Sequence, residues 1–281
     1  MRYDPTRRSL YHPESGEPVD GFSHEWPVEW ICAELSRLAY YRFDEGDGPR
    51  LERALTGAGF SALAAFNVPR SGAQAFVTLS PQGTAFVAFR GTQPGGLADF
   101  RTDLQFGWAD WPGGGRVHRG FKEAYESIAG EISAWLERSA PSGLVATGHS
   151  LGGALATLLA AERAEADLVT FGSPRVGDAA FAGNFLRRQV RRYVDCTDKV
   201  AAVPPEVLGY RHLHGEIYLN RFGLALPAPS IEERSEDQAA ARKIYIRKYA
   251  WRIWRNVAVR DLADHAPVNY VSAATGRRDP D

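Results

Sequence analysis

The chain has 281 residues, of which 44% are hydrophobic and 24% are charged. These are ordinary globular values, and the length fits one large α/β domain better than two well-built ones. No stretch approaches the roughly 18 consecutive apolar residues of a membrane-spanning helix, which excludes an integral membrane protein. The formal net charge is -1, so no overall field favours nucleic acid, and we expect no nucleic-acid partner.

The N-terminal segment and the cysteines bear on the compartment. Residues 1–21 carry charges throughout and three prolines, without the basic start and apolar core of a secretory leader. We therefore expect a cytoplasmic protein, although a secreted one that had lost its leader would look the same. Cys32 and Cys196 are too few and too far apart for a disulfide framework or a zinc site, and we expect two buried thiols.

Short apolar runs that end in turns alternate with stretches of helical period along most of the chain. This alternation predicts an α/β fold with a mostly parallel central sheet and flanking helices, and no linker or repeat divides residues 1–281. Strands are predicted at 74–79, 84–89, 144–147, 168–171 and 190–196, and helices at 28–41, 121–136 and 151–163.

Residues 93–116 differ from the rest, because glycines bracket a run of aromatic and apolar side chains. Such a frame suits a lid that moves over an active site, with Phe100, Leu104, Phe106 and Trp108 as its apolar residues. The alternative is an ordinary surface loop with its aromatic side chains tucked in.

Residues 148–152 read Gly-His-Ser-Leu-Gly, which fits the G-x-S-x-G pattern of a nucleophilic serine. A predicted strand precedes the motif and a predicted helix follows it, as the sharp turn around the serine requires. Ser150 is therefore the predicted nucleophile. The backbone N–H of Leu151, at the start of the helix, suits a developing oxyanion.

A serine nucleophile needs a histidine base and an acid that orients it, in the chain order Ser, acid, His. His265 stands beside Pro267 in a predicted loop and is the preferred base, while His212 and His214 lie in a strand-like run, where a structural role is expected for one of them. Asp195 and Asp198 both follow the strand at 190–196. Asp198 lies beyond the strand end and is better placed for the acid.

Six motifs occur in the order found in the class 3 lipases, so the chain resembles that family over roughly residues 70–272. The motifs span residues 87–92, 117–121, 148–155, 170–177, 198–205 and 264–270.

The resemblance implies an α/β-hydrolase fold with a lid insertion. It also implies Ser150 as nucleophile, Asp198 as acid and His265 as base, with Thr92 and Leu151 forming the oxyanion hole. Residues 1–70 carry no family motif and are expected to form an N-terminal helical extension.

Two other stretches carry charged residues of the kinds that bind ligands. The acidic residues 44–48 lack the ligand spacing of a calcium loop and predict a solvated turn, and we assign no metal. Residues 242–260 carry seven Lys or Arg, no acid and four aromatic side chains. They predict a basic amphipathic helix, which either contacts an anionic lipid surface or packs on the domain with a solvated basic face.

The motifs together predict a lipase that cleaves acylglycerol esters through an acyl-enzyme and needs no cofactor. Its expected partners are a lipid or ester substrate and a lipid interface, contacted through the lid and residues 242–260. Two sibling hydrolases, a phospholipase A1 and a short-chain esterase, are the alternatives, followed by a non-catalytic lipid-binding protein.

Overall fold

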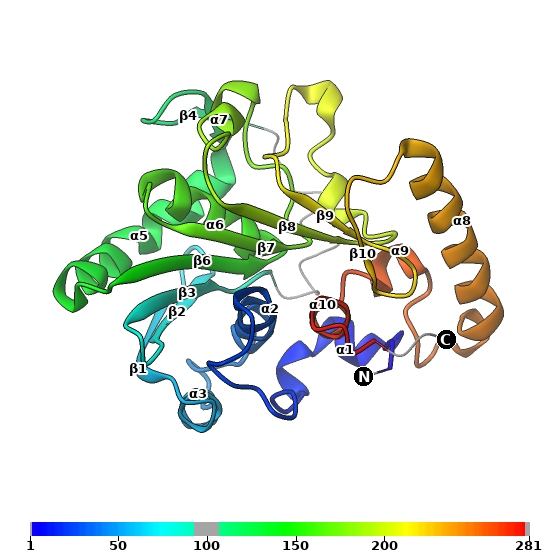
Figure 1. The fold of residues 1–281 in the computed structure, drawn as a ribbon, viewed down its shortest axis with the longest axis horizontal. Helices are drawn as coiled ribbons and strands as arrows, with labels where there is room; N and C mark the ends of the chain where they lie inside the picture. The colour runs from blue at the N-terminus through cyan, green and yellow to red at the C-terminus, as the bar shows by residue number, and fades with distance from the viewer. Residues whose placement is uncertain (1, 93–106, 279–281) are drawn as a thin grey trace.

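An eight-stranded sheet organises the protein, whose computed structural model describes residues 2–92 and 107–278 (Figure 1). The strands lie in the order β1-β2-β3-β6-β7-β8-β9-β10. Their bounds are β1 Ser61–Val68, β2 Ala73–Leu79, β3 Thr84–Phe89, β6 Gly143–His149, β7 Asp167–Phe171, β8 Val190–Asp195, β9 Glu216–Leu219 and β10 Ala225–Leu226.

The centre of this sheet is parallel and its two edges are antiparallel. Strands β3, β6, β7, β8 and β9 pair in parallel, with Val87 opposite Ala146, while β1, β2 and β10 pair antiparallel with their neighbours. Parallel strands bury both faces, which explains the almost uninterrupted apolar runs in these strands. All five strands predicted from the sequence are present, within one or two residues of their expected ends.

Helices cover both faces of the sheet (Figure 1). Helices α5 and α6 lie on one face, and α2 and α10 lie on the other. The helix bounds are α1 Arg7–Tyr11, α2 Val28–Leu38, α3 Gly48–Gly57, α5 Arg119–Ser139, α6 Leu151–Glu162, α7 Ala179–Gly183, α8 Ile231–Lys248, α9 Arg260–Ala263 and α10 Pro267–Ala274.

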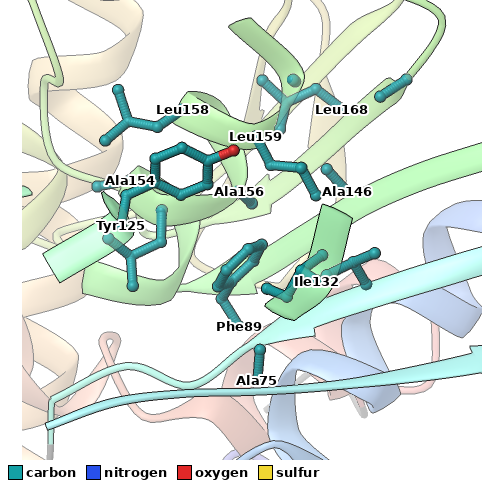
Figure 2. Packing of buried hydrophobic residues seen from close by; sticks show 14 of the residues in the cluster. Ala75, Phe89, Tyr125, Ile132, Ala146, Ala154, Ala156, Leu158, Leu159 and Leu168 are labelled. Carbon is teal, nitrogen blue, oxygen red and sulfur yellow. The ribbon is translucent and has the colours of Figure 1, made fainter. Parts of the chain in front are cut away.

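The larger core lies between the sheet and helices α5 and α6. Figure 2 shows Tyr125, Ala154 and Leu158 of these helices gathered over Phe89 of β3 and Ala146 of β6. All five side chains are almost completely buried. Burying each large apolar side chain contributes about 1.5–3 kcal/mol, so this layer fixes the position of the strand that leads to Ser150.

The N-terminal segment is an integral part of this fold. Residues 1–70, expected to form a helical extension, contain helices α1, α2 and α3 and also the edge strand β1, Ser61–Val68, which pairs with β2. Helix α2 buries Leu35 and Leu38 against the central strands.

A small two-stranded sheet follows the undescribed residues 93–106. Strand β4 covers Trp108–Asp110 and pairs antiparallel with β5, Arg116–His118. The second half of the candidate lid at 93–116 is therefore a short hairpin.

Helix α8 ends earlier than the sequence predicts. A capping box of Ser230 and Glu233 starts it, and it stops at Lys248. Ala250–Arg252 is a separate 3-10 turn, so the prediction of one amphipathic helix over residues 242–260 is wrong. Among residues 2–92 and 107–278, no helix is both long and apolar enough to cross a membrane.

One buried histidine makes the stability of this fold depend on pH. His118 is 3% exposed, its ring nitrogens have no hydrogen-bond partner within the described part of the chain, and burial lowers its pKa to about 4. The unfolded chain takes up this proton near its ordinary pKa of about 6.5. Stability is therefore complete above that value and is lost as the pH falls towards 4.

We predict that lowering the pH from about 7 to about 5 reduces the thermal stability of His118→Leu less than that of the parent protein. The check is the unfolding midpoint across this range, followed by circular dichroism. A second variant, His118→Gln, also lacks a titrating ring and should show the same reduced pH dependence. An equal pH dependence for the parent and His118→Leu would contradict this account.

Candidate active site

Ser150 occupies the sharp turn between strand β6 and helix α6. Its backbone angles are φ 58° and ψ -130°, which L-residues adopt only under strain. The strand ends at His149 and the helix begins at Leu151, so the serine lies at the carboxyl edge of the parallel sheet. The strand-turn-helix context predicted from the sequence is present.

Two glycines allow the chain to pass through this turn. A Cβ on Gly148 would lie 2.3 Å from the carbonyl of Gly152, and a Cβ on Gly152 would lie 2.2 Å from the carbonyl oxygen of Phe89. Both distances are too short for any side chain. The two glycines of the motif therefore serve close backbone packing, which holds Ser150 in its strained conformation.

A hydrogen bond joins the predicted acid to the predicted base. His265 Nδ1 lies 2.8 Å from Asp198 Oδ2, and both side chains are at most 1% exposed. Asp198 follows β8, and His265 lies just before α10, so the pair connects two loops that are 67 residues apart in sequence. Asp198 Oδ1 also accepts a bond from the backbone N–H of Val200.

Tyr270 holds the same carboxylate from a second direction. Its hydroxyl donates to Asp198 Oδ2 at 2.6 Å and accepts from the backbone N–H of Asp195 at 3.0 Å. Burial raises the pKa of Tyr270 well above its usual value, which keeps the hydroxyl proton in place. Sequence analysis assigned no role to Tyr270, although it lies in the last motif, five residues after His265.

Asp195, the alternative acid, is occupied elsewhere. Its carboxylate forms a buried bidentate ion pair with Arg278, which also donates to the backbone carbonyl of Asn269. Of the two candidate aspartates, the structure brings Asp198 to His265.

His149 lies against the ring of His265. The two ring centroids are 4.4 Å apart, and the Tyr40 hydroxyl lies 2.7 Å from His149 Nδ1. Burial, with His265 nearby, lowers the pKa of His149 well below its ordinary value. A neutral His149 therefore packs on the base without adding a charge, and no sequence motif indicated Tyr40 from the N-terminal segment.

Three buried polar atoms at this site have unused hydrogen-bonding capacity within the described part of the chain. Ser150 Oγ, His265 Nε2 and Thr92 Oγ1 are buried and have no hydrogen-bond partner among the described residues. Buried polar atoms are normally paired, and these three are free to form hydrogen bonds with a bound reactant. Leu151 opens helix α6, whose first N–H groups have no acceptor within the helix. Groups of these types are the ones that acyl transfer requires: a hydroxyl, a ring nitrogen that can take its proton, and N–H donors for an oxyanion.

The candidate lid residues divide into two groups. Phe100, Leu104 and Phe106 lie outside the described residues. Trp108 lies in β4 and stacks on Tyr210, with ring centroids 4.0 Å apart, while the guanidinium of Arg116 lies 4.8 Å from the centroid of the Trp108 ring.

The remaining candidate ligands are occupied by structural contacts. His212 Nε2 lies 2.7 Å from the carbonyl oxygen of Ala201, and His214 Nε2 lies 2.7 Å from that of Phe185. Both cysteines are buried and free. Within residues 2–92 and 107–278, no cluster of three or more His, Cys, Asp or Glu could hold a metal ion.

The acidic turn at residues 44–48 contacts neighbouring side chains of its own chain. Asp44 accepts hydrogen bonds from Asn67 and Gln74, and Asp47 accepts one from the backbone of Arg42. These bonds fit the turn predicted from the sequence.

Comparison with known proteins shows which family part of this chain resembles. Residues 86–208 match the family Lipase (class 3). A secreted mono- and diacylglycerol lipase 1 of Fusarium solani is 41% identical over 132 residues, which are 42% of this chain and 39% of that protein. A lipase of Rhizomucor miehei is 34% identical over 153 residues, 48% and 42% of the two chains. The chain thus spans about two fifths of the length of the curated relatives it matches.

Solved structures agree with these matches. The Rhizomucor miehei lipase propeptide complex has a TM-score of 0.58 at 25% identity, covering 68% of this chain and 67% of that one. The lipase of Rhizopus microsporus var. chinensis gives 0.58 at 26%, covering 68% and 72%. The predicted resemblance to the class 3 lipases and the predicted α/β-hydrolase fold are confirmed.

The two aspartates should respond differently to the same substitution. We predict that Asp198→Asn lowers kcat on a soluble p-nitrophenyl ester by several orders of magnitude with little loss of stability, because His265 loses its orienting carboxylate. Asp195→Asn should instead cost about 3–5 kcal/mol of stability, because Arg278 keeps a buried charge without its partner.

Kinetics at a temperature where both variants are folded, together with urea unfolding, separate the two effects. If Asp195→Asn abolished kcat while Asp198→Asn kept it, the assignment of the acid would be overturned.

Proposed function

We propose that this chain, built on a class 3 lipase core, is a serine ester hydrolase that cleaves acylglycerol ester bonds. The observation that supports it most is the Asp198–His265 hydrogen bond. It leaves His265 Nε2 without a partner among the described residues, and the His265 ring packs against His149, which precedes Ser150. An oriented base beside a strained serine is the arrangement needed for acyl transfer.

In the first step, Ser150 Oγ forms a bond to the ester carbonyl carbon. The hydroxyl proton passes to His265 Nε2, and the carbonyl oxygen takes the negative charge. Asp198 stabilises the imidazolium through Nδ1, and Tyr270 and the Val200 N–H keep the carboxylate in place. The strained backbone of Ser150 keeps the nucleophile at the sheet edge throughout.

The oxyanion is proposed to bind between Thr92 and the start of helix α6. Thr92 would donate its hydroxyl and backbone N–H, and Leu151 would donate its backbone N–H. The positive end of the α6 dipole adds to this stabilisation. Such donors act mainly on the transition state, because the charge on the oxygen develops there.

Collapse of the intermediate breaks the bond between the carbonyl carbon and the alcohol oxygen. His265 Nε2 returns its proton to the leaving alcohol, and the acyl group stays on Ser150. Water then attacks the acyl-enzyme with the same base, which restores Ser150 and releases the carboxylic acid. The sequence of steps uses no cofactor.

The substrate class is proposed from the likeness to the relatives. A relative called a mono- and diacylglycerol lipase shares 41% of the matched residues with this chain, which supports acylglycerols over phospholipids. Long-chain acylglycerols form aggregates in water, so the protein would contact a lipid surface at the candidate lid. A phospholipase A1 and a short-chain esterase share the same chemistry and differ in the substrate alone.

A substrate panel tests this proposal directly. Purified protein would be assayed on p-nitrophenyl esters of increasing chain length, on emulsified mono-, di- and triacylglycerols, and on phosphatidylcholine vesicles, with Ser150→Ala as the control. We predict that acylglycerols are cleaved fastest, that the rate steps up where the substrate begins to aggregate, and that Ser150→Ala is inactive throughout.

Each of the other outcomes would overturn one part of the proposed function. Preference for phosphatidylcholine would favour the phospholipase, and activity confined to short soluble esters would favour the esterase. No activity of the parent on any ester would overturn the hydrolase proposal.

A further inference from the structure

A run of exposed apolar and basic side chains follows helix α8. We call residues 251–255, Trp-Arg-Ile-Trp-Arg, the tryptophan turn, and all five are exposed. Trp251 is 58% exposed, Ile253 62% and Trp254 71%. Tryptophan is seldom left this open to water, because each indole carries a large apolar surface.

Hydrogen bonds and aromatic packing hold the tryptophan turn in place. The backbone N–H of Arg7 donates to the carbonyl of Arg255, and the N–H of Val257 donates to that of Pro5, so the turn pairs with the start of the chain. In Figure 1 the orange loop that follows α8 runs close to the blue N-terminal segment. Asn256 Nδ2 also donates to the carbonyl of Tyr249, and below the turn Tyr245 packs edge-on against Tyr3.

A hollow of about 940 Å³ lies between the tryptophan turn and residues 2–6. Four basic residues line it: Arg2, Lys248, Arg252 and Arg255. Among the described lining residues Asp4 alone carries a carboxylate, and its Oδ1 already accepts a bond from the Thr6 N–H. The hollow is therefore positively charged.

Charge and apolar side chains are combined within the same few residues. The guanidinium of Arg252 lies 4.1 Å from the centre of the Trp251 ring, and Trp254 packs edge-on against Trp251. The residues from 242 to 260 include seven Lys or Arg and no acid. Arg242 and Arg260 pair with Asp261 and Asp264, whereas Arg252 and Arg255 belong to the turn itself and line the hollow.

We infer that the tryptophan turn and the adjoining basic hollow form a docking site for the surface of an anionic phospholipid bilayer. Indole rings partition to the level of the headgroups, and each Lys or Arg near such a surface adds electrostatic attraction. The phosphates would lie in the basic hollow, while Trp251, Ile253 and Trp254 enter the interface.

The purpose of this docking site depends on the proposed function: it would hold a lipid-ester hydrolase at the surface that contains its substrate. A folded nucleic acid is a poorer fit, because Ile253 and two indoles would face its charged backbone. A protein partner would need a matching acidic and apolar surface, and binding to pure lipid would not require one.

The test measures binding without turnover. The Ser150→Ala protein, as the full chain, would be sedimented with vesicles of phosphatidylcholine alone and of phosphatidylcholine with phosphatidylglycerol. We predict tighter binding to the anionic vesicles, which weakens as salt is raised. Adding Trp251→Ser and Trp254→Ser should lower the affinity by about tenfold or more, and adding Arg252→Gln and Arg255→Gln should remove the preference for anionic lipid.

A matched control lies on another surface. Leu186 is 71% exposed beside the exposed Arg187, so Leu186→Ser with Arg187→Gln removes the same kinds of group and should leave binding unchanged. Unchanged binding by the folded Trp251→Ser, Trp254→Ser protein would overturn the inference, as would equal binding to neutral and anionic vesicles or binding to neither. Hydrolysis of a soluble ester by the same double variant with Ser150 intact should match the parent, and this assay reports on the proposed function independently of binding.

Discussion

The hydrogen bond between Asp198 and His265 is the interaction on which the site depends. It joins two loops that are far apart in sequence, and both partners are buried. Buried polar groups are costly unless their hydrogen bonds are satisfied, so the surrounding fold must hold both side chains in position. Tyr270 and the Val200 N–H do this for the carboxylate, and the ring of His149 packs against the base.

A second layer of buried charge holds these two loops together. Asp264, next to His265, accepts bonds from the backbone N–H and hydroxyl of Thr197, next to Asp198. The same carboxylate accepts from Tyr3 and Arg260, so the start of the chain supports the loops directly. Buried ion networks of this kind are weak sources of net stability, and their contribution here is a fixed geometry.

Local patterns in the sequence were sufficient to predict the core of the fold and the sharp turn at Ser150. Buried parallel strands need continuous apolar runs, and the turn at Ser150 needs glycines on both sides. Both features are therefore determined by residues that are neighbours in the sequence. The roles of Tyr40 and Tyr270 were not predictable in this way, because each depends on a contact with a residue far along the chain. Their hydroxyls act through His149 and Asp198.

The end of helix α8 was likewise not predictable from the local sequence. Residues 249–255 contain neither proline nor glycine, so local propensity gives no reason for the helix to stop at Lys248. The chain leaves the helix where residues 255 and 257 pair with residues 7 and 5, and Tyr245 donates to the carbonyl of Val257. Tertiary contacts therefore overrode a continuous helical period, and this change of direction exposes the tryptophan turn.

The central claim is that Ser150 is a nucleophile activated by His265, and covalent labelling with a small fluorophosphonate tests it most directly. Attack by Ser150 Oγ on phosphorus would release fluoride and leave a stable adduct, which mass spectrometry locates on a peptide. The account predicts one adduct, on Ser150, that forms far more slowly in His265→Ala and is absent after unfolding. An adduct on another serine, or equally fast labelling without His265, would contradict it.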